Sequence, residues 1–342
     1  MTDISDPAAP VAAVLFDPAG KSLAEGTVTV PAPEGFDLRV AVEAASVNPV
    51  DVKMQGRIPA DAAPRPLGFD AAGRVTHAGP GALALGFSPG DMVWYAGAAN
   101  RAGANARAQL VDARIAARAP EGMAPEDAAA LPLTLLTAWE VLFDKLGFAE
   151  PPSEGPATAQ DGGLLIINGA GGVGSIALQL ARLAGIRATA TASRKESRDW
   201  CQRMGAAEVI AHDALADLPD SSFRAILCCH DTDAYFPTMA RLIAPMGMIA
   251  SIVGAQAPLP MGALFMKSAG FVWEYMFARP VFALPDMARQ GAILARATVL
   301  VEAGQIVSTR TATLEGLSLA NVLGAHETLL AGRQIGKLAL RY

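Results

Sequence analysis

The amino-acid sequence predicts an α/β protein with two units, a mostly β unit followed by a doubly wound parallel sheet. Its 342 residues exceed what one hydrophobic core usually holds, so two domains are expected. The first third is rich in Gly, Pro and Val and contains short alternating runs, which are typical of strands joined by tight turns. Beyond residue 160, strand-like and helix-like segments alternate, and this alternation predicts parallel βαβ units.

The β unit is predicted from period-two runs such as TVTV (27–30) and LRVAVEAA (38–45). From about residue 128, apolar residues follow helical spacing in AAALPLTLLTAWEVLFDKL, which predicts one or two helices between the β unit and the following segment. Residues 150–163 are polar and rich in Pro and Gly, and they are expected to form a loop.

The second half is predicted as a series of strands and helices that ends on a strand. Strands are expected at 164–168, 186–192, 208–212, 223–229, 247–253, 306–313 and 335–342. Helices are expected at 175–185, 196–206, 234–245, 287–302 and 319–330. The last strand could return to the N-terminal β unit, which would make that domain discontinuous.

The charge pattern argues against one class of partner. The net charge is −6, and the Lys and Arg residues are scattered, the tightest group being Arg194, Lys195 and Arg198. Binding to nucleic acid needs clustered cations that contact phosphates, so no nucleic-acid surface is expected.

The cysteines and the N-terminus indicate a reducing, cytoplasmic setting. The three cysteines include adjacent Cys228 and Cys229, which cannot easily bridge each other, so no disulfide framework is expected. The first residues, MTDISDPAAPV, lack the basic start and apolar core of a signal peptide. Residues 242–266 carry no charge and are long enough to cross a bilayer. Prolines and glycines interrupt them, however, so a buried strand is expected and not a membrane span.

A glycine-rich loop predicts a dinucleotide site. Gly169, Gly171 and Gly174 form a G-x-G-x-x-G pattern directly after a predicted strand and at the start of a predicted helix. The first glycine permits a tight turn, the second lets the backbone approach a pyrophosphate, and the third allows close packing of helix on strand. Free N–H groups at the helix start, around Gly172 and Val173, would then face the phosphates. The alternative is a glycine-rich turn without a ligand.

The end of the next predicted strand favours NADPH over NADH. An enzyme that uses NAD commonly carries an acidic residue there, which binds the ribose hydroxyls. This chain has Ser193, Arg194 and Lys195 instead. One or two charged hydrogen bonds to a 2′-phosphate, each contributing about 1.5–3 kcal/mol, would favour NADPH by roughly tenfold to a few hundredfold. The alternative is a solvated basic helix start.

Several motifs together resemble one superfamily over nearly the whole chain. They are SVNPVD, LGFDAAGRV, PGDMVWYAG, AALPLTLLTAWE, NGAGGVGS, LIAPMGMIASI, VWEYMFARP, LVEAGQI and AGRQIGKLAL. In this order they resemble the medium-chain dehydrogenase/reductase superfamily, and within it the zinc-free quinone oxidoreductase branch and its zinc-type alcohol dehydrogenase-like group. The resemblance implies a GroES-like catalytic domain from residues 1–134 and 285–342, and a Rossmann NADP-binding domain from residues 135–284.

The resemblance also implies an activity, which is reduction of quinones or α,β-unsaturated carbonyls by NADPH, usually in homodimers. Two alternatives stay open. One is a zinc-type alcohol dehydrogenase. The other is an NADPH-binding sensor or structural protein with little turnover, because a cofactor motif guarantees binding more than chemistry.

The positions of the metal ligands argue against zinc. Zinc-using members place a Cys in the first motif and a His-Glu pair in the second, where this chain has Asn48, Phe69 and Asp70. A catalytic zinc needs about three N, S or carboxylate ligands, and only Asp70 is such a donor. Residues 91–200 contain no cysteine, so the four-cysteine lobe of the zinc enzymes is also absent. Without zinc to polarise an alcohol oxygen, an acceptor that already delocalises the hydride charge is favoured.

Three residues are candidates for catalysis. Asn48 matches the family's polar residue that faces the nicotinamide and orients a carbonyl. Asp51 is positioned to fix the loop or to act in proton transfer, the alternative being a turn-capping role after Pro49. Tyr95 is a possible proton donor, the alternative being an aromatic that only packs.

Further positions match the cofactor-binding segments of the family. Thr134 lies in a segment that passes beside the cofactor, His212 falls near the adenosine end, and Val253 lies at a strand end, where open α/β sheets bind ligands. The Met-rich and aromatic segment 265–280 lies near the pocket and the dimer contact in the family, or is plain core.

Overall fold

The computed structural model describes residue 6 and residues 9–342. These residues form two compact units: residues up to 133 together with 277–342 (unit 1), and residues 134–276 (unit 2). The sequence placed the second junction at 284/285, eight residues later. The junction is earlier because Phe277 already packs on Phe69 of unit 1, with ring centroids 4.5 Å apart.

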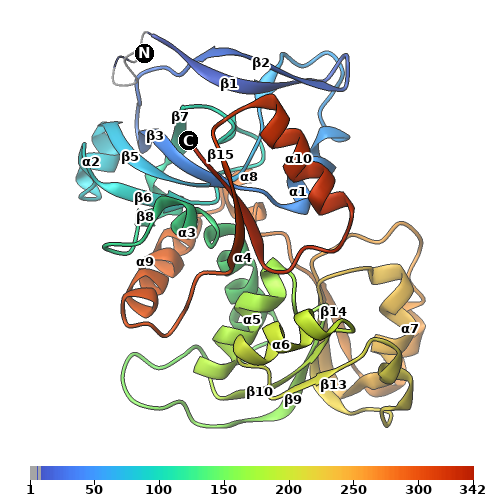
Figure 1. The fold of residues 1–342 in the computed structure, drawn as a ribbon. Helices are drawn as coiled ribbons and strands as arrows, with labels where there is room; N and C mark the ends of the chain where they lie inside the picture. Colours follow the sequence, from blue (N-terminus) through green and yellow to red (C-terminus); the bar gives the residue numbers. More distant parts are fainter. Residues whose placement is uncertain (1–5, 7–8) are drawn as a thin grey trace. The chain divides into compact units, whose positions relative to one another are not determined.

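Unit 1 is built on a seven-stranded sheet that joins both ends of the chain. Its order is β15 (Arg310–Glu315), β16 (Lys337–Arg341), β3 (Asp37–Ser46), β5 (Asp70–Ala78), β6 (Met92–Tyr95) and β8 (Ala116–Arg118), with β7 (Ala108–Asp112) also on β3. Strand β16 is antiparallel to β3, with Ala339 opposite Ser46. The final strand therefore lies inside the N-terminal sheet, as the red and blue strands of Figure 1 show.

A smaller sheet and short helices complete unit 1. The sheet has the order β2 (Ser22–Thr29), β1 (Pro10–Asp17) and β4 (Arg65–Pro66). The helices are α1 (Pro49–Gln55), α2 (Pro80–Ala84), α3 (Pro125–Ala129), α8 (Ala278–Val281), α9 (Arg289–Glu302) and α10 (Leu319–Leu330). Alternate residues of β3, including Leu38, Val40 and Val42, are buried in the core, as the period-two pattern predicts. This is the mostly β unit that the sequence predicts, and it contains strands from both ends of the chain.

Unit 2 is a parallel sheet with helices on it. Its order is β11 (Glu208–Ile210), β10 (Ile186–Thr191), β9 (Gln160–Ile167), β12 (Phe223–Cys228), β13 (Ile243–Ser251) and β14 (Gly270–Trp273). All neighbouring pairs are parallel. Numbered within the unit, this is the order 3-2-1-4-5-6 of the Rossmann fold. The helices α5 (Gly172–Leu183), α6 (Lys195–Arg203) and α7 (Thr232–Leu242) connect the strands.

The structure of unit 2 differs from the prediction in the bounds of some elements and in one additional strand. The expected loop 150–163 is shorter, because β9 already begins at Gln160. The helix expected at 234–245 ends at Leu242, and β13 follows without a loop. Strand β14 was not predicted. Residues 242–266 therefore form a strand and a 3₁₀ segment, and no helix in the described part of the chain is long and apolar enough to span a membrane.

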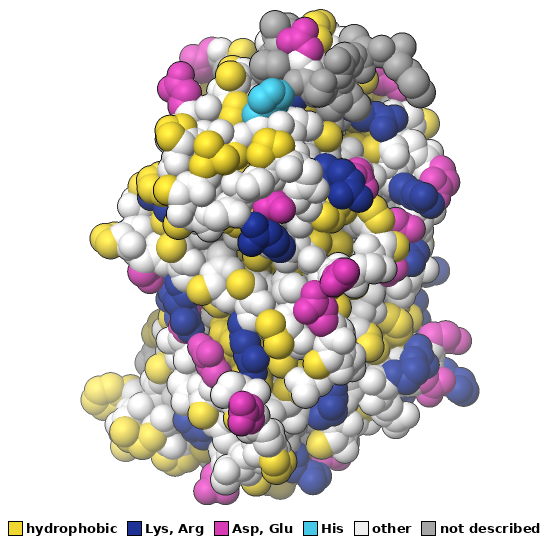
Figure 2. Space-filling model, turned by 90° about the vertical axis from the view of Figure 1, so that its left-hand side faces the viewer, with side chains coloured by type: hydrophobic (Ala, Val, Ile, Leu, Met, Phe, Trp, Pro, Cys, Tyr) yellow, Lys and Arg dark blue, Asp and Glu magenta, His cyan; other side chains and the backbone are white. Residues whose placement is uncertain are grey.

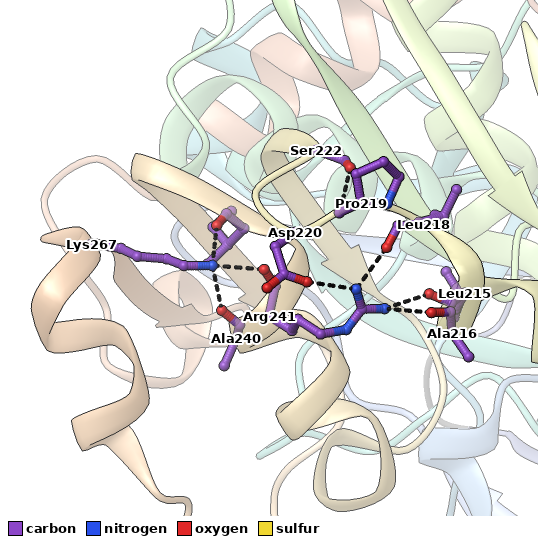
Figure 3. Close-up of polar contacts among 10 residues, drawn as sticks. Leu215, Ala216, Leu218, Pro219, Asp220, Ser222, Ala240, Arg241 and Lys267 are labelled. Atoms are coloured by element: carbon purple, nitrogen blue, oxygen red, sulfur yellow. Dashed lines mark hydrogen bonds and ion pairs between the residues drawn. The ribbon is translucent and has the colours of Figure 1, made fainter.

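Two cations hold the C-terminal end of α7 in unit 2. Arg241 donates to the carbonyl oxygens of Leu215 (2.7 Å) and Leu218 (2.6 Å), and pairs with Asp220 at 2.8 Å. Lys267 donates to three carbonyl oxygens at this helix end, those of Ala240, Arg241 and Ile243, as Figure 3 shows for this cluster. Cations are favoured here because the last carbonyls of a helix have no partner within the helix.

Acidic and basic side chains are interspersed on the surface. On the face drawn in Figure 2, Lys, Arg, Asp and Glu side chains lie among apolar and uncharged atoms. In unit 1, Arg101 pairs with Asp37 through two nitrogen–oxygen contacts of 2.7 and 2.8 Å. Such two-point contacts between Arg and a carboxylate have a fixed geometry.

Candidate functional site

The glycine-rich loop lies between β9 and α5 in unit 2. The left-handed residue of this turn is Asn168, with φ +67°, and not Gly169. Asn tolerates this backbone conformation better than most residues. The left-handed conformation of the turn is therefore at the residue before the first glycine. Gly169 is needed for space, because a Cβ there would lie 2.7 Å from the Ala190 Cβ and 3.2 Å from the Cys201 Sγ.

The other two glycines have the spacing that a dinucleotide loop requires. A Cβ on Gly174 would lie 2.6 Å from the carbonyl oxygen of Gly169, so this position allows the helix to pack closely on the strand end. At Gly171 the nearest atom to such a Cβ is the Asn168 Nδ2, at 3.5 Å. The backbone at Gly171 is thus open on one side. Gly171, Gly172 and Val173 are partly exposed, so the first N–H groups of α5 can meet a ligand.

The end of β10 carries the predicted phosphate-binding residues. Ser193, Arg194 and Lys195 are all exposed, and Arg194 is the residue from which α6 begins. Lys195 pairs with Asp199 one turn later at 2.6 Å, and the exposed Arg194 is a second candidate for binding a 2′-phosphate. The Ser193 Oγ accepts from the backbone N–H of His212 at 3.4 Å, so it lies beside the end of β11.

His212 and Val253 also follow strands of the same parallel sheet. The Nδ1 of His212 lies 2.7 Å from the Tyr235 hydroxyl, and burial lowers the pKa of the imidazole. The carbonyl oxygen of Val253 accepts from Thr232 of α7. Since parallel strands end at one edge, the loops that carry these residues and the glycine turn share that edge of unit 2. Thr134, on α4 (Pro132–Trp139), is buried.

A buried polar network occupies the position of the zinc ligands in unit 1. Asp70 is fully buried, and its Oδ2 accepts from Lys337 Nζ (3.0 Å), Asn48 Nδ2 (2.8 Å) and Ser46 Oγ (3.0 Å). Its Oδ1 accepts from the backbone N–H of Leu133 at 2.7 Å. The Asp70 carboxyl group is therefore paired with a cation and hydrogen-bonded at both oxygens, as a buried charged group requires.

Lys337 is the cation of this network, and the sequence did not single it out. Its ammonium donates to Asp70, to the carbonyl oxygen of Val47 at 2.9 Å and to the Asn48 Oδ1. All three of its N–H donors are thus used. These bonds fix the Asn48 amide, whose oxygen faces Lys337 and whose nitrogen faces Asp70. One amide hydrogen of Asn48 is left for another acceptor.

The donor set does not fit zinc. Asn48 and Phe69 are not zinc ligands of the usual kind, and Phe69 packs on Phe277. Asp70 is bound to an ammonium group, which would repel a metal cation. Among residue 6 and residues 9–342, no group of three or more His, Cys, Asp and Glu side chains is arranged to hold a metal.

Asp51 is buried beside this network with one oxygen unpaired. Its Oδ2 accepts from the backbone N–H of Asn48 at 2.6 Å, which caps the start of α1. Its Oδ1 is buried and has no hydrogen-bond partner among the described residues. Burial raises the pKa of the Asp51 carboxyl to about 7, against the opposing effects of the Asn48 N–H and the Lys337 ammonium. The Asp51 carboxyl therefore caps helix α1 and can also carry a proton near neutral pH.

Tyr95 lies in the core of unit 1. It is fully buried, and its hydroxyl donates to the Gln109 Oε1 at 3.0 Å. Burial raises the pKa of the phenol well above its usual range, so the hydroxyl keeps its proton. Tyr95 therefore lies in a packed environment, which corresponds to the alternative role of an aromatic residue that only packs.

Comparisons with known proteins agree with this two-unit architecture. Residues 34–126 match a family model described as alcohol dehydrogenase GroES-like domain, and residues 172–278 match one described as zinc-binding dehydrogenase. A zinc-type alcohol dehydrogenase-like protein of Staphylococcus aureus (strain COL) is 43% identical over 315 residues, which cover 91% of this chain and 92% of that protein.

Two further similarities extend this result. The solved structure of a protein from Rhizobium etli CFN 42, described as a zinc-dependent alcohol dehydrogenase, has a TM-score of 0.88 and 38% identity, and the match covers 98% of each chain. A trans-enoyl reductase of Pyrenochaetopsis sp is 35% identical over 198 residues, which cover 56% of this chain and 54% of that protein.

Proposed function

Because the chain belongs to the medium-chain dehydrogenase/reductase superfamily of oxidoreductases, we propose that it is a zinc-independent, NADPH-dependent reductase of quinones or α,β-unsaturated carbonyls. The observation that carries this proposal is the Lys337–Asp70 ion pair at the position where the zinc-using members bind their metal. The trans-enoyl reductase among the relatives acts on an unsaturated acyl chain, which supports the same class of acceptor.

The absence of suitable metal ligands determines which acceptors are chemically reasonable. In zinc enzymes the metal stabilises the developing alkoxide by several kcal/mol. In this chain the cation at the matching position is the Lys337 ammonium, and its three N–H donors are already bound to protein oxygens. Quinones and enones spread the incoming charge over a conjugated system, so they demand less stabilisation from the protein. Unactivated alcohols and ketones demand more.

The choice of NADPH rests on the glycine loop and on the basic start of α6. Open backbone at Gly171 and the partly exposed N–H groups of Gly172 and Val173 fit a pyrophosphate. Arg194 and Ser193 offer a guanidinium and a hydroxyl to a 2′-phosphate at the end of β10.

The bound cofactor supplies a hydride, and reduction of the acceptor is completed by one proton. Asp51 is the group of unit 1 suited to hold that proton, because its carboxyl has a pKa of about 7 and an unpaired Oδ1. Asn48, fixed between Lys337 and Asp70, offers its remaining amide hydrogen to a carbonyl oxygen. The protein otherwise contributes binding and orientation.

A chelator experiment tests the proposal. The purified protein is treated with a zinc chelator, its metal content is measured, and oxidation of NADPH and NADH is followed with a panel of quinones, enones and simple ketones. We expect retained turnover of quinones or enones with preference for NADPH. Activity that is lost with the metal and returns with zinc would instead support an alcohol dehydrogenase. Binding of NADPH without turnover of any acceptor would support a sensor or structural protein.

We also propose that the protein assembles as a homodimer through the edge of the unit 2 sheet. Strand β14 is the last strand of that sheet. Large apolar side chains are exposed on this strand and just before it: Trp273 of β14 is 43% exposed, and Phe265 and Met266 of the preceding 3₁₀ segment are 79% and 88% exposed. An unpaired strand edge with apolar neighbours is a ready interface for a second copy. Sedimentation analysis of the wild type and of Met266→Lys tests it, and we expect dimers that weaken in the variant. A monomeric wild type would contradict this proposal.

A further inference from the structure

The indole of Trp200 contacts the glycine loop from a different helix. Trp200 lies on α6, and its Nε1 donates to the Ser175 Oγ of α5 at 2.8 Å. Ser175 is fully buried, and its hydroxyl in turn donates to the carbonyl oxygen of Gly171 at 2.7 Å. Two hydrogen bonds therefore connect α6 to the central glycine of the loop.

The direction of these bonds follows from the chemistry of the groups. An indole N–H can only donate, so the Ser175 hydroxyl must accept from Trp200 and direct its own proton elsewhere. The Gly171 carbonyl oxygen accepts the hydrogen bond from the Ser175 hydroxyl, and it also accepts one from the Ser175 backbone N–H at 2.9 Å. Fixing this carbonyl fixes the planar peptide unit that it shares with the N–H of Gly172. That N–H is one of the free donors at the start of α5.

Helix α6 also carries the candidate phosphate-binding residues. It begins after Arg194, and Cys201, next to Trp200, lies against Gly169 of the same loop. The guanidinium of Arg203 lies 5.4 Å from the centre of the Trp200 ring and steadies its orientation. One short helix therefore links both ends of the proposed cofactor site within unit 2.

From these contacts we infer that Trp200 is a positioning residue that couples the pyrophosphate loop to the 2′-phosphate end of the site. This inference rests on the proposed NADPH-dependent function. With Trp200 in place, the Gly172 N–H and the start of α6 are held in one arrangement. A nucleotide that contacts both therefore gains more binding free energy from this arrangement than a nucleotide that contacts the loop alone. Trp200 thus contributes to the preference for NADPH without touching the cofactor.

Nucleotide titrations of the wild type and four variants test the inference. Dissociation constants for NADPH and NADH are measured with the wild type, Trp200→Phe, Ser175→Ala and the double variant. Phe keeps the ring beside Arg203 but has no N–H. Trp139→Phe is the matched control, because it removes another indole hydrogen bond of unit 2, to Glu150 at 3.2 Å, away from the loop. Thermal unfolding of each variant reports whether it is folded.

The expected result is a selective loss. Trp200→Phe raises the NADPH dissociation constant about threefold to tenfold, the range set by one neutral hydrogen bond. The NADH constant rises less, so the preference for NADPH falls, while kcat at saturating NADPH stays within about twofold of the wild type. Ser175→Ala gives the same pattern, and the double variant is no worse than Ser175→Ala alone, because both single changes break one chain of bonds.

Different failures point to different conclusions. If Trp200→Phe and Ser175→Ala bind both nucleotides like the wild type, or if their losses add in the double variant, the coupling is refuted. If Trp200→Phe is unfolded, Ser175→Ala decides the matter alone by the same criteria. If the wild type binds neither nucleotide, the proposed function fails, and the inference fails with it.

Discussion

Replacing Asp51 with asparagine is expected to make the protein more stable at pH 8 relative to the wild type. The folded protein holds the Asp51 carboxyl at a pKa of about 7, above the ordinary value of 3.8. Between these two values the folded state binds a proton that the unfolded state has released. The free energy of unfolding therefore falls as pH rises through this interval and is level above it. Asparagine cannot ionise, and its oxygen can still accept from the Asn48 N–H.

The size of the effect follows from the shift. A difference of 7 − 3.8, about 3 pKa units, corresponds to about 4 kcal/mol over the whole interval at 1.36 kcal/mol per unit. Between pH 5 and pH 7 the share is two units, or about 3 kcal/mol. That is a large fraction of the stability of a typical domain. The source is the buried, unpaired Oδ1, which is costly once the carboxyl carries a charge.

Urea unfolding at pH 5, 6, 7 and 8 measures this effect. The difference in unfolding free energy, Asp51→Asn minus wild type, is expected to grow by about 3 kcal/mol from pH 5 to pH 8. Asp61→Asn, at an exposed position of unit 1, is the control and should show a constant difference. A difference for Asp51→Asn that does not change with pH would refute the assignment of the raised pKa.

Further substitutions test three other parts of the site: the buried ion pair, the glycine loop and the phosphate-binding end. Lys337→Met leaves Asp70 buried without a cation, so it should lower the free energy of unfolding by about 3–5 kcal/mol. Adding Asp70→Asn should restore part of this loss. If urea unfolding shows no loss for Lys337→Met, the ion pair is dispensable for stability. Gly174→Ala should destabilise unit 2 by about 1–3 kcal/mol, because the new Cβ meets a backbone oxygen. Gly171→Ala should stay folded and bind NADPH more weakly. Thermal unfolding and nucleotide titration separate the two effects, and equal stability of both variants would contradict the spacing argument. Arg194→Ala should lower the preference for NADPH over NADH roughly tenfold in KM, and an unchanged ratio would remove Arg194 from the phosphate site.

The parts of the molecule that were predictable are those with local patterns. The glycine spacing predicts the loop because strand, turn and helix are consecutive in the chain. The alternation of strands and helices predicts the parallel sheet for the same reason. Strand β14 was missed because a strand of four residues, Gly270–Trp273, has too few residues to show a period.

The buried network in unit 1 could not be found in this way. Lys337 and Asp70 are 267 positions apart, and they meet because β16 and β5 both pair with β3. A lysine at the start of an apolar strand carries no sign of such a partner. Tyr95 has the opposite difficulty, since an aromatic residue at a strand end looks the same in the sequence whether its hydroxyl faces a cleft or, as here, Gln109.

The return of β16 to the N-terminal sheet has a consequence for synthesis on the ribosome. Unit 2 is contiguous, so all of its strands have been made once residue 276 has been added. Unit 1 must wait for residues 337–341, and until then the end of β3 has an unpaired edge and Asp70 has no cation. Because domains fold as units while the chain emerges, unit 2 is expected to fold first and the half-made unit 1 to be the species most exposed to aggregation. Chaperone demand during translation should therefore come from the first 133 residues, although they are the first to leave the ribosome.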